Sequence, residues 1–221
     1  MSRKVKLTSK MSATSSYRLD LKDKILKVAM QAFSSKGIRA VKMDDIAKMM
    51  SISKRTLYEI YADKETLLYS GVKRREEEFS DHMDHFSEAE GHSVIDTLVE
   101  FARCLLEYSG NVNPVFYADL HKYEKVLNFL KQKHQTSQSC AYGFFQKGVQ
   151  EGYFRPDIDY NLVILISNIS RQAIKEQRLF KKFGMKEIFR SCVFVFIRGV
   201  CTPLGQSVLE KALENELFGN D

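Results

Sequence analysis

The spacing of apolar residues constrains the fold more than any other feature of this sequence. Aliphatic and aromatic side chains recur at steps of three and four residues, as at Ile25, Val28, Ala29, Ala32 and Phe33. That is the period of an α-helix with one buried face. The 221 residues include 3 prolines and 11 glycines, too few for the many turns of a sandwich or barrel. The sequence therefore predicts an all-α fold.

Composition indicates a folded chain without disulfide bonds. Hydrophobic residues make up 44% of the chain, more than disordered chains contain. The cysteines form no CxxC pair and lie in or beside apolar segments, which is typical of reduced thiols; they are Cys104, Cys140, Cys192 and Cys201. No apolar stretch approaches the ~18 residues of a membrane span, and the basic N-terminus lacks the apolar core of a signal peptide. We therefore expect a cytoplasmic protein without membrane contact.

Charge is divided unevenly along the chain. Residues 1–65 carry 15 Lys and Arg against 7 Asp and Glu, a net charge of +8, whereas residues 66–221 carry 19 against 21. A basic N-terminal third joined to a near-neutral remainder is typical of a polyanion-binding domain attached to a body with another task.

The first 18 residues are expected to form a flexible basic arm. They are rich in Ser, Thr and Lys, lack helical apolar periodicity and contain no acidic residue. Such an arm either follows DNA phosphates or enters a minor groove, or is a solvated tail, which is the commoner case. Its basic residues are Arg3, Lys4, Lys6, Lys10 and Arg18.

Two short helices follow a longer one that ends at Gly37. The first is predicted over residues 44–50 and the second over residues 53–58, with Ser53 as N-cap. A short break separates them, and a long helix is predicted from about Lys64 to His85. This succession is typical of a helix-turn-helix unit, whose second helix enters a DNA major groove ~12 Å wide. Apolar residues are expected to hold the two helices together: Ile46, Ala47, Ile52 and Leu57.

The same region resembles the TetR (tetracycline-repressor-like) family of bacterial regulators. The resemblance rests on Ile46-Ala47, on the run from Ile52 to Tyr58, on Tyr61, and on the run from Asp63 to Leu68. It implies a three-helix DNA-binding domain over residues 19–66 and a larger helical ligand-binding and dimerisation domain over residues 67–221. Ser51 replaces the usual turn glycine, which predicts either mild backbone strain or a different turn, and Lys42 replaces the usual Ser or Thr cap.

Residues on the outward side of the second short helix are predicted to contact DNA. Arg55 is expected to pair with guanine, Lys54 and Lys64 with phosphates, and Tyr58 with a phosphate or a thymine methyl group. The full set of expected DNA-binding residues is Lys42, Ser53, Lys54, Arg55, Thr56, Tyr58 and Lys64.

Aromatic residues are frequent between residues 101 and 145. The family resemblance implies that this region holds a pocket for a small molecule, and an aromatic lining suits an apolar or aromatic ligand. Aromatic residues at helical spacing are more often core. The expected ligand-binding residues are Phe101, Cys104, Tyr108, Phe116, Tyr117, Tyr142 and Phe145.

The last two long helices are expected over residues 159 to about 180 and over residues 186–201. Both are apolar on more than one face. Such helices are buried on several sides, within a monomer or across a two-fold axis. The family resemblance implies that they pair in a homodimer. The expected interface residues are Ile166, Ile169, Phe189, Val193 and Phe196.

Motifs for other chemistry are weak or missing. His82, His85 and Glu88 stand at three-residue steps, as zinc ligands on one helix face do, but the surrounding segment is polar throughout and is better interpreted as a solvated helix end. We therefore expect no metal and no cofactor. The sequence contains no Gly-x-Ser-x-Gly, P-loop or dinucleotide-binding turn, so an enzyme is not expected.

Together these features predict a homodimeric repressor that a small apolar or aromatic ligand releases from a palindromic operator. The alternative is a DNA-bound adaptor that recruits a protein partner and binds no small molecule. A closed aromatic cavity would favour the first hypothesis, and an exposed apolar patch over a filled body would favour the second.

Overall fold

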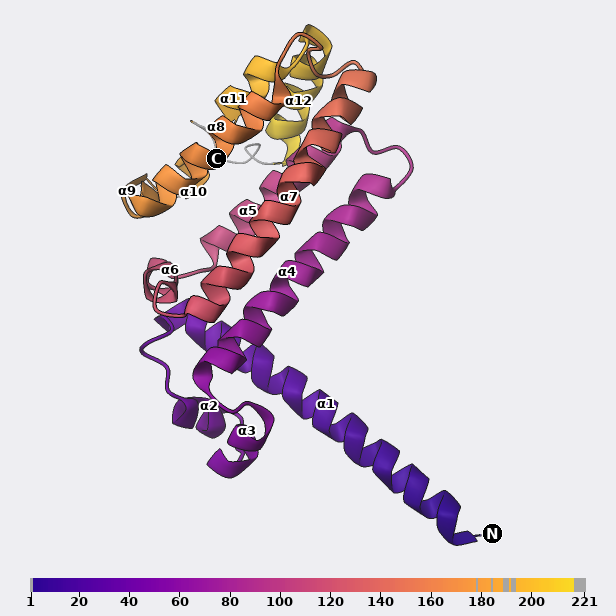
Figure 1. Ribbon diagram of the computed structural model, residues 1–221, viewed down its shortest axis with the longest axis vertical. Coiled ribbons are helices and arrows are strands. Elements are labelled where there is room, and N and C mark those ends of the chain that lie inside the picture. Colours follow the sequence, from indigo (N-terminus) through magenta and orange to yellow (C-terminus); the bar gives the residue numbers. More distant parts are fainter. Residues whose placement is uncertain (1, 178, 184, 189–190, 192–193, 217–221) are drawn as a thin grey trace. The chain divides into compact units, whose positions relative to one another are not determined.

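The computed structural model describes residues 2–177, 179–183, 185–188, 191 and 194–216. Within these ranges the chain is helical apart from turns and one isolated β-bridge between Phe154 and Cys201, which confirms the predicted all-α fold (Figure 1). The helices are α1 (Ser2–Lys36), α2 (Met43–Met49), α3 (Lys54–Ile60), α4 (Lys64–Glu88), α5 (Val94–Gly110), α6 (Pro114–Leu120), α7 (Glu124–Gln150), α8 (Tyr160–Glu176), α9 (Leu179–Phe183), α10 (Met185–Ile188), α11 (Phe194–Val200) and α12 (Pro203–Glu216). Among the described residues, no helix is both long and apolar enough to cross a membrane.

The N-terminal arm differs from the prediction. Residues 2–18 are not an irregular tail but the first half of α1, a single helix of 35 residues. The segment contains no proline or glycine, so nothing in its backbone interrupts a helix that starts there. Of the predicted helix over residues 186–201, the described parts lie in α10 (Met185–Ile188) and α11 (Phe194–Val200).

The chain folds as two compact units. The first comprises residues 1–76 together with residues 115–129, and the second comprises residues 77–114 and 130–221. Helix α4 contributes its first half to one unit and its second half to the other. The first unit therefore includes a segment from the region that the sequence analysis assigned wholly to the C-terminal domain.

In the first unit, α1, α2 and α3 enclose a core with the start of α4. The side chains of Phe33, Ile46, Leu57 and Leu67 are fully buried there. Helix α1 is terminated by Gly37, as predicted: this residue follows Lys36 with a left-handed φ of 87°, which glycine adopts without a steric penalty.

The segment of residues 115–129 completes this unit. The buried carboxylate of Asp119 accepts a hydrogen bond of 2.8 Å from the backbone N–H of Arg39, and Phe116 is 1% exposed. The Tyr69 ring contacts Phe129 edge-on at 5.5 Å between centroids, and Lys125 Nζ lies 4.7 Å from the Tyr69 ring centroid. Residues from two distant parts of the sequence thus form one packed domain.

In the second unit, α5, α7, α8, α11 and α12 surround a separate core. Its members include Ile95, Val99, Phe154, Phe194 and Leu209, all at most 1% exposed. The loop before α8 is fixed to the turn before α12, because Arg155 N donates to Val200 O at 2.9 Å and Thr202 N donates to Tyr153 O at 2.9 Å.

Candidate functional site

The turn between α2 and α3 sets the angle of the two short helices. Ser51 has a φ of 53°, the one left-handed non-glycine residue among those described, so the expected strain at this position is present. On either side of it, Met50 N donates to Ile46 O and Ile52 N donates to Ala47 O, both at 3.0 Å. These bonds close α2 tightly and direct the chain into α3.

Helix α3 begins at a well-formed cap. Ser53 Oγ accepts the backbone N–H of Thr56 at 3.0 Å and lies 2.8 Å from the Thr56 hydroxyl. Both hydroxyls are thus engaged in fixing the first turn of α3. Lys42 provides no such side-chain cap for α2, as expected, and the Lys42 N–H donates instead to Asp45 Oδ2 at 2.9 Å.

The outward side of α3 carries an exposed row of polar and cationic side chains, which we call the α3 row: Lys54, Arg55 and Tyr58. The side chain of Arg55 is 89% exposed and that of Lys54 is 64% exposed, whereas Leu57 on the opposite side is fully buried. Arg55 Nε donates to Glu59 Oε1 at 2.9 Å. Lys54 pairs with Asp44 of α2, and this hydrogen bond raises the pKa of Lys54.

Both ion pairs of the α3 row lie in water. Exposed pairs of this kind contribute little to stability, so a phosphate or a guanine edge can replace either carboxylate. The row therefore presents two positive charges on a narrow helix that is held from behind by an apolar core, which is the geometry for entering a major groove.

Lys64 does not lie in the α3 row. Its side chain is half-buried at the start of α4, with Nζ 5.8 Å from the Phe33 ring centroid, and burial lowers the pKa of Lys64. Arg18, by contrast, lies beside α3: its Nη2 donates to the carbonyl oxygen of Glu59 at 3.2 Å. From the sequence, Arg18 was expected only as part of the basic arm, because a contact across 41 residues leaves no local pattern.

The expected ligand-binding residues are divided between the two units. Phe116 and Tyr117 lie in the first unit, where they contact each other edge-on at 5.6 Å between ring centroids. Phe145 belongs to the core of the second unit, stacked on Tyr160 at 4.8 Å. Tyr142 on α7 is 42% exposed.

The remaining three expected ligand residues share one face of α5. Phe101, Cys104 and Tyr108 stand three and four residues apart, which aligns their side chains along the helix. Phe101 also meets Phe79 of α4 edge-on at 5.7 Å between ring centroids.

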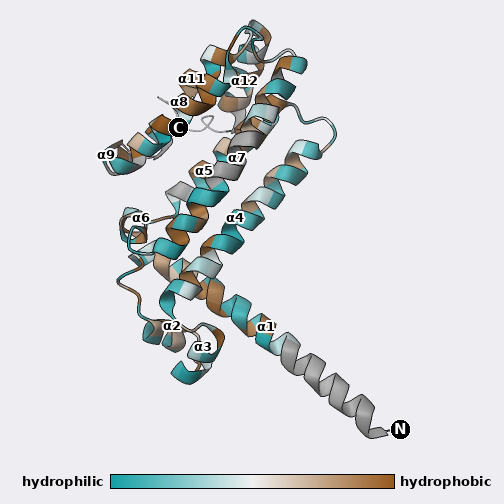
Figure 2. Ribbon diagram, in the orientation of Figure 1, coloured by the Kyte–Doolittle hydropathy of each residue, from teal (hydrophilic) through white to brown (hydrophobic). Residues whose placement is uncertain are grey.

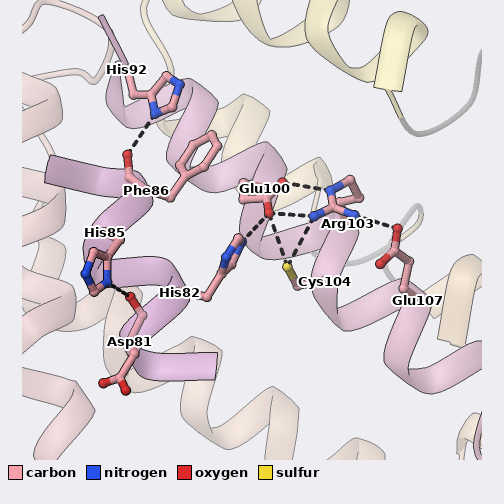
Figure 3. Close-up of polar contacts among 9 residues, drawn as sticks. All are labelled: Asp81, His82, His85, Phe86, His92, Glu100, Arg103, Cys104 and Glu107. Atoms are coloured by element: carbon pink, nitrogen blue, oxygen red, sulfur yellow. Dashed lines mark hydrogen bonds and ion pairs between the residues drawn. The ribbon is translucent and has the colours of Figure 1, made fainter. Parts of the chain in front are cut away.

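A polar cluster joins α4 to this face of α5 (Figure 3). The carboxylate of Glu100, 8% exposed, lies at its centre. Glu100 Oε1 is 2.5 Å from His82 Nε2, 2.6 Å from Arg103 Nη2 and 3.4 Å from Cys104 Sγ. Arg103 also bonds Glu107 Oε1 at 2.5 Å. We call His82, Glu100, Arg103, Cys104 and Glu107 the Glu100 cluster.

Charge and burial set the ionisation of this cluster. The Arg103 guanidinium lowers the pKa of Glu100 to about 2, and burial raises the pKa of Cys104 to about 11, with a further contribution from Glu100. Near neutral pH the carboxylate is therefore ionised and the thiol protonated.

The structure does not bring His82, His85 and Glu88 together as a metal site. His85 Nδ1 lies 2.6 Å from the Asp81 carbonyl oxygen, and Glu88 is exposed. His82 instead meets Glu100, 18 residues further along. Glu100 and Arg103 carry no local signal in the sequence, because their grouping with His82 depends on how two helices pack.

A second set of exposed side chains, on α8 and on α11, is apolar, and Figure 2 shows hydrophobic residues along both helices. We call it the α8 stripe; its members, with exposed fractions, are Leu162 (53%), Leu165 (55%), Ile166 (39%) and Ile169 (59%) on α8 and Val195 (58%) and Phe196 (46%) on α11. The α8 residues recur at steps of three, one and three, which places them on one helix face. The other two expected interface residues, Phe189 and Val193, lie outside the described residues.

Comparisons with known proteins agree with this geometry. Residues 25–69 match the family described as bacterial regulatory proteins, tetR family. The HTH-type transcriptional repressor KstR2 of Mycolicibacterium smegmatis is 24% identical over 157 residues, which cover 64% of this chain and 71% of that protein.

Solved structures share the fold. A TetR-family transcriptional regulator from Marinobacter aquaeolei VT8 superimposes with a TM-score of 0.64 at 19% identity, over 86% of this chain and 98% of the other. The ketosteroid transcriptional regulator KstR2 of Mycobacterium tuberculosis gives a TM-score of 0.53 at 16% identity, over 82% and 95% of the two chains. The chain is a helix-turn-helix DNA-binding transcriptional regulator. Residues 25–69 carry its similarity to the tetR family.

Proposed function

We propose that this regulator is a homodimeric repressor that binds a near-palindromic operator and leaves it when a small apolar or aromatic ligand binds. The observation that carries the proposal is the α3 row, two exposed cations and a tyrosine above the buried Leu57. Arg55 reads a guanine through O6 and N7, while Lys54 and Lys42 contact phosphates. Ser53 and Thr56 position the first turn of α3 against the DNA backbone.

Repression follows from occupancy of a promoter. A protein bound tightly in the major groove excludes other proteins from the same DNA. The similar mycobacterial protein carries the name of a transcriptional repressor, which supports repression over activation for this chain.

Dimerisation through the α8 stripe gives the operator its symmetry. A two-fold axis places two copies of α3 on one duplex, and each copy reads one half-site. The two half-sites are then related as a near-palindrome, about 34–36 Å or a multiple apart.

The effector is proposed to bind the face of α5 that carries Phe101 and Tyr108. Phe79 of α4 contacts Phe101 on this face. The N-terminal half of the same helix belongs to the first unit, where Leu67 and Leu68 are buried in the core of the DNA-binding domain. A ligand that shifts α4 changes the spacing of the two α3 helices in the dimer, and DNA lowers ligand affinity by the same factor. A coupling of about 1–3 kcal/mol is sufficient for induction.

The test is selection of bound DNA from a random pool with the full chain, followed by footprinting. We expect one near-palindromic motif whose protected bases change identity when Arg55 is substituted. Affinity for that motif is then measured against a panel of apolar and aromatic compounds. Binding without any preferred sequence overturns the operator proposal. A preferred sequence whose affinity no compound alters overturns the effector proposal and favours the adaptor that recruits a protein.

A further inference from the structure

The Glu100 cluster brings three different metal-ligating groups to one point. His82 reaches it from α4, while Glu100 and Cys104 stand one helical turn apart on α5. Their nearest ligand atoms, one from each residue, all lie within 4.8 Å of one another. We propose that His82, Glu100 and Cys104 bind a zinc ion that links α4 to α5 within the second unit.

The distances suit such an ion. Bonds of about 2.0–2.3 Å at tetrahedral angles separate neighbouring ligand atoms by about 3.3–3.8 Å. Cys104 Sγ and Glu100 Oε1 are already 3.4 Å apart. His82 Nε2 is 2.5 Å from the same oxygen, so it has to retreat by about 1 Å, and its side chain, 47% exposed, has room to rotate.

The ion takes the place of two hydrogen-bond protons. Cys104 loses its thiol proton to solvent, and neutral His82 moves its ring proton from Nε2 to Nδ1, so binding releases one proton per ion. The thiolate and the carboxylate together neutralise the two positive charges of the ion. The positive charge of Arg103 remains balanced by Glu107, which it already bonds.

Arg103 acts in this site as a positioning residue. Its Nε and Nη2 hold the two carboxylate oxygens of Glu100 at 2.7 and 2.6 Å. Hydrogen bonds of this kind orient a ligating carboxylate without occupying the metal. The carboxylate is 8% exposed, so its position is already fixed before an ion arrives.

The donor set selects the type of metal. A thiolate and an imidazole with one carboxylate favour zinc over calcium or magnesium, which take oxygen ligands. Three protein ligands leave a fourth position, and the exposure of His82 puts that position within reach of water.

The experiment measures metal bound to the purified full chain after zinc loading and exhaustive dialysis. We expect one zinc ion per chain, and a cobalt-loaded sample with the intense absorption of a thiolate-to-metal charge transfer. Cys104→Ser should lose that absorption and weaken zinc affinity at least tenfold, and His82→Gln should weaken it similarly. Helical circular dichroism of the metal-free variants verifies that they are folded.

Two matched controls lie in the same unit but outside the cluster. Cys140→Ser removes an exposed thiol, and His85→Gln removes the neighbouring histidine of α4; both should bind zinc as the parent chain does. Zinc retained by Cys104→Ser, equal losses in the controls, or a parent chain that keeps no zinc overturns the proposal. The cluster is then a metal-free polar bridge between two helices. DNA affinity plays no part in these readouts, so the outcome is independent of the proposed repressor function.

Discussion

The α3 row and the α8 stripe are both exposed to water, but the side chains of the α3 row are polar or charged and those of the α8 stripe are apolar. Arg55 and Ile169 are each more than half exposed. Water solvates a guanidinium well, so the α3 row, the proposed DNA contact, is stable without DNA. An aliphatic side chain gains about 1.5–3 kcal/mol on full burial, and the α8 stripe gathers six apolar side chains. The α3 row is therefore suited to reversible binding of a polyanion, and the α8 stripe to a stable interface with a second copy of the chain.

The largest expected effect comes from placing a charge in the α8 stripe. Ile169→Asp puts an unpaired carboxylate into the proposed dimer interface twice, once from each copy, and buried unpaired charges are strongly destabilising. We expect the dimer to weaken by at least about 3 kcal/mol, roughly a hundredfold or more in dissociation constant. Sedimentation velocity should show monomers, with affinity for a palindromic operator lost. Phe196→Asp should act in the same way.

Exposure in the single chain makes this experiment informative. Because Ile169 is 59% exposed, the aspartate should leave the fold intact, which circular dichroism verifies. Leu204→Asp is the control, since Leu204 is 57% exposed on α12 and outside the stripe. A fully dimeric Ile169→Asp chain would place the interface on another surface.

A smaller effect is expected from Arg55→Ala in the α3 row. Loss of a bidentate contact to guanine should weaken binding to the specific site by about 1–3 kcal/mol and relax base choice there. The measurement is affinity for operator and for random DNA at one salt concentration. Glu59→Gln is the matched control, because it removes the carboxylate that pairs with Arg55 in the free protein and keeps the guanidinium. Equal losses on both DNAs would assign Arg55 to phosphate contact.

The smallest expected effect concerns the start of α1. Arg18 fixes this helix beside the end of α3, and four more cations precede it without an acid. We expect removal of residues 1–15 to reduce the slope of log affinity against log salt by about 3–4, since each phosphate contact contributes about 0.9. A full-length chain with Arg3, Lys4, Lys6 and Lys10 changed to Gln should match the truncation. An unchanged slope would make the segment a solvated tail.

Local sequence was sufficient to predict the helix-turn-helix unit. Residues a few positions apart decide the cap at Ser53, the left-handed Ser51 and the buried Leu57, so their spacing carries the information. Local sequence was also sufficient to predict the helix that carries Ile166 and Ile169, because these residues follow a helical period.

What the sequence did not predict depends on contacts between distant segments. His82 was assigned to a solvated helix end, and only packing of α4 on α5 brings it to Glu100. Lys64 was expected to contact a phosphate, and its Nζ also lies 5.8 Å from the ring centroid of Phe33, 31 residues earlier, a contact that leaves no local pattern. The helical start of α1 was missed because a polar segment without periodicity resembles an irregular tail.

The discontinuous make-up of the first unit affects how this protein is synthesised and how it can be recombined. The hydrogen bond from Arg39 to Asp119 and the contact of Tyr69 with Phe129 form only after the ribosome has delivered the intervening 77–114 segment. The DNA-binding domain thus completes its packing only after residues 77–114 of the second unit have been synthesised. A chimera built by exchanging residues 1–76 alone would separate Asp119 from its backbone donor, whereas exchanging residues 115–129 with them would preserve the domain whole.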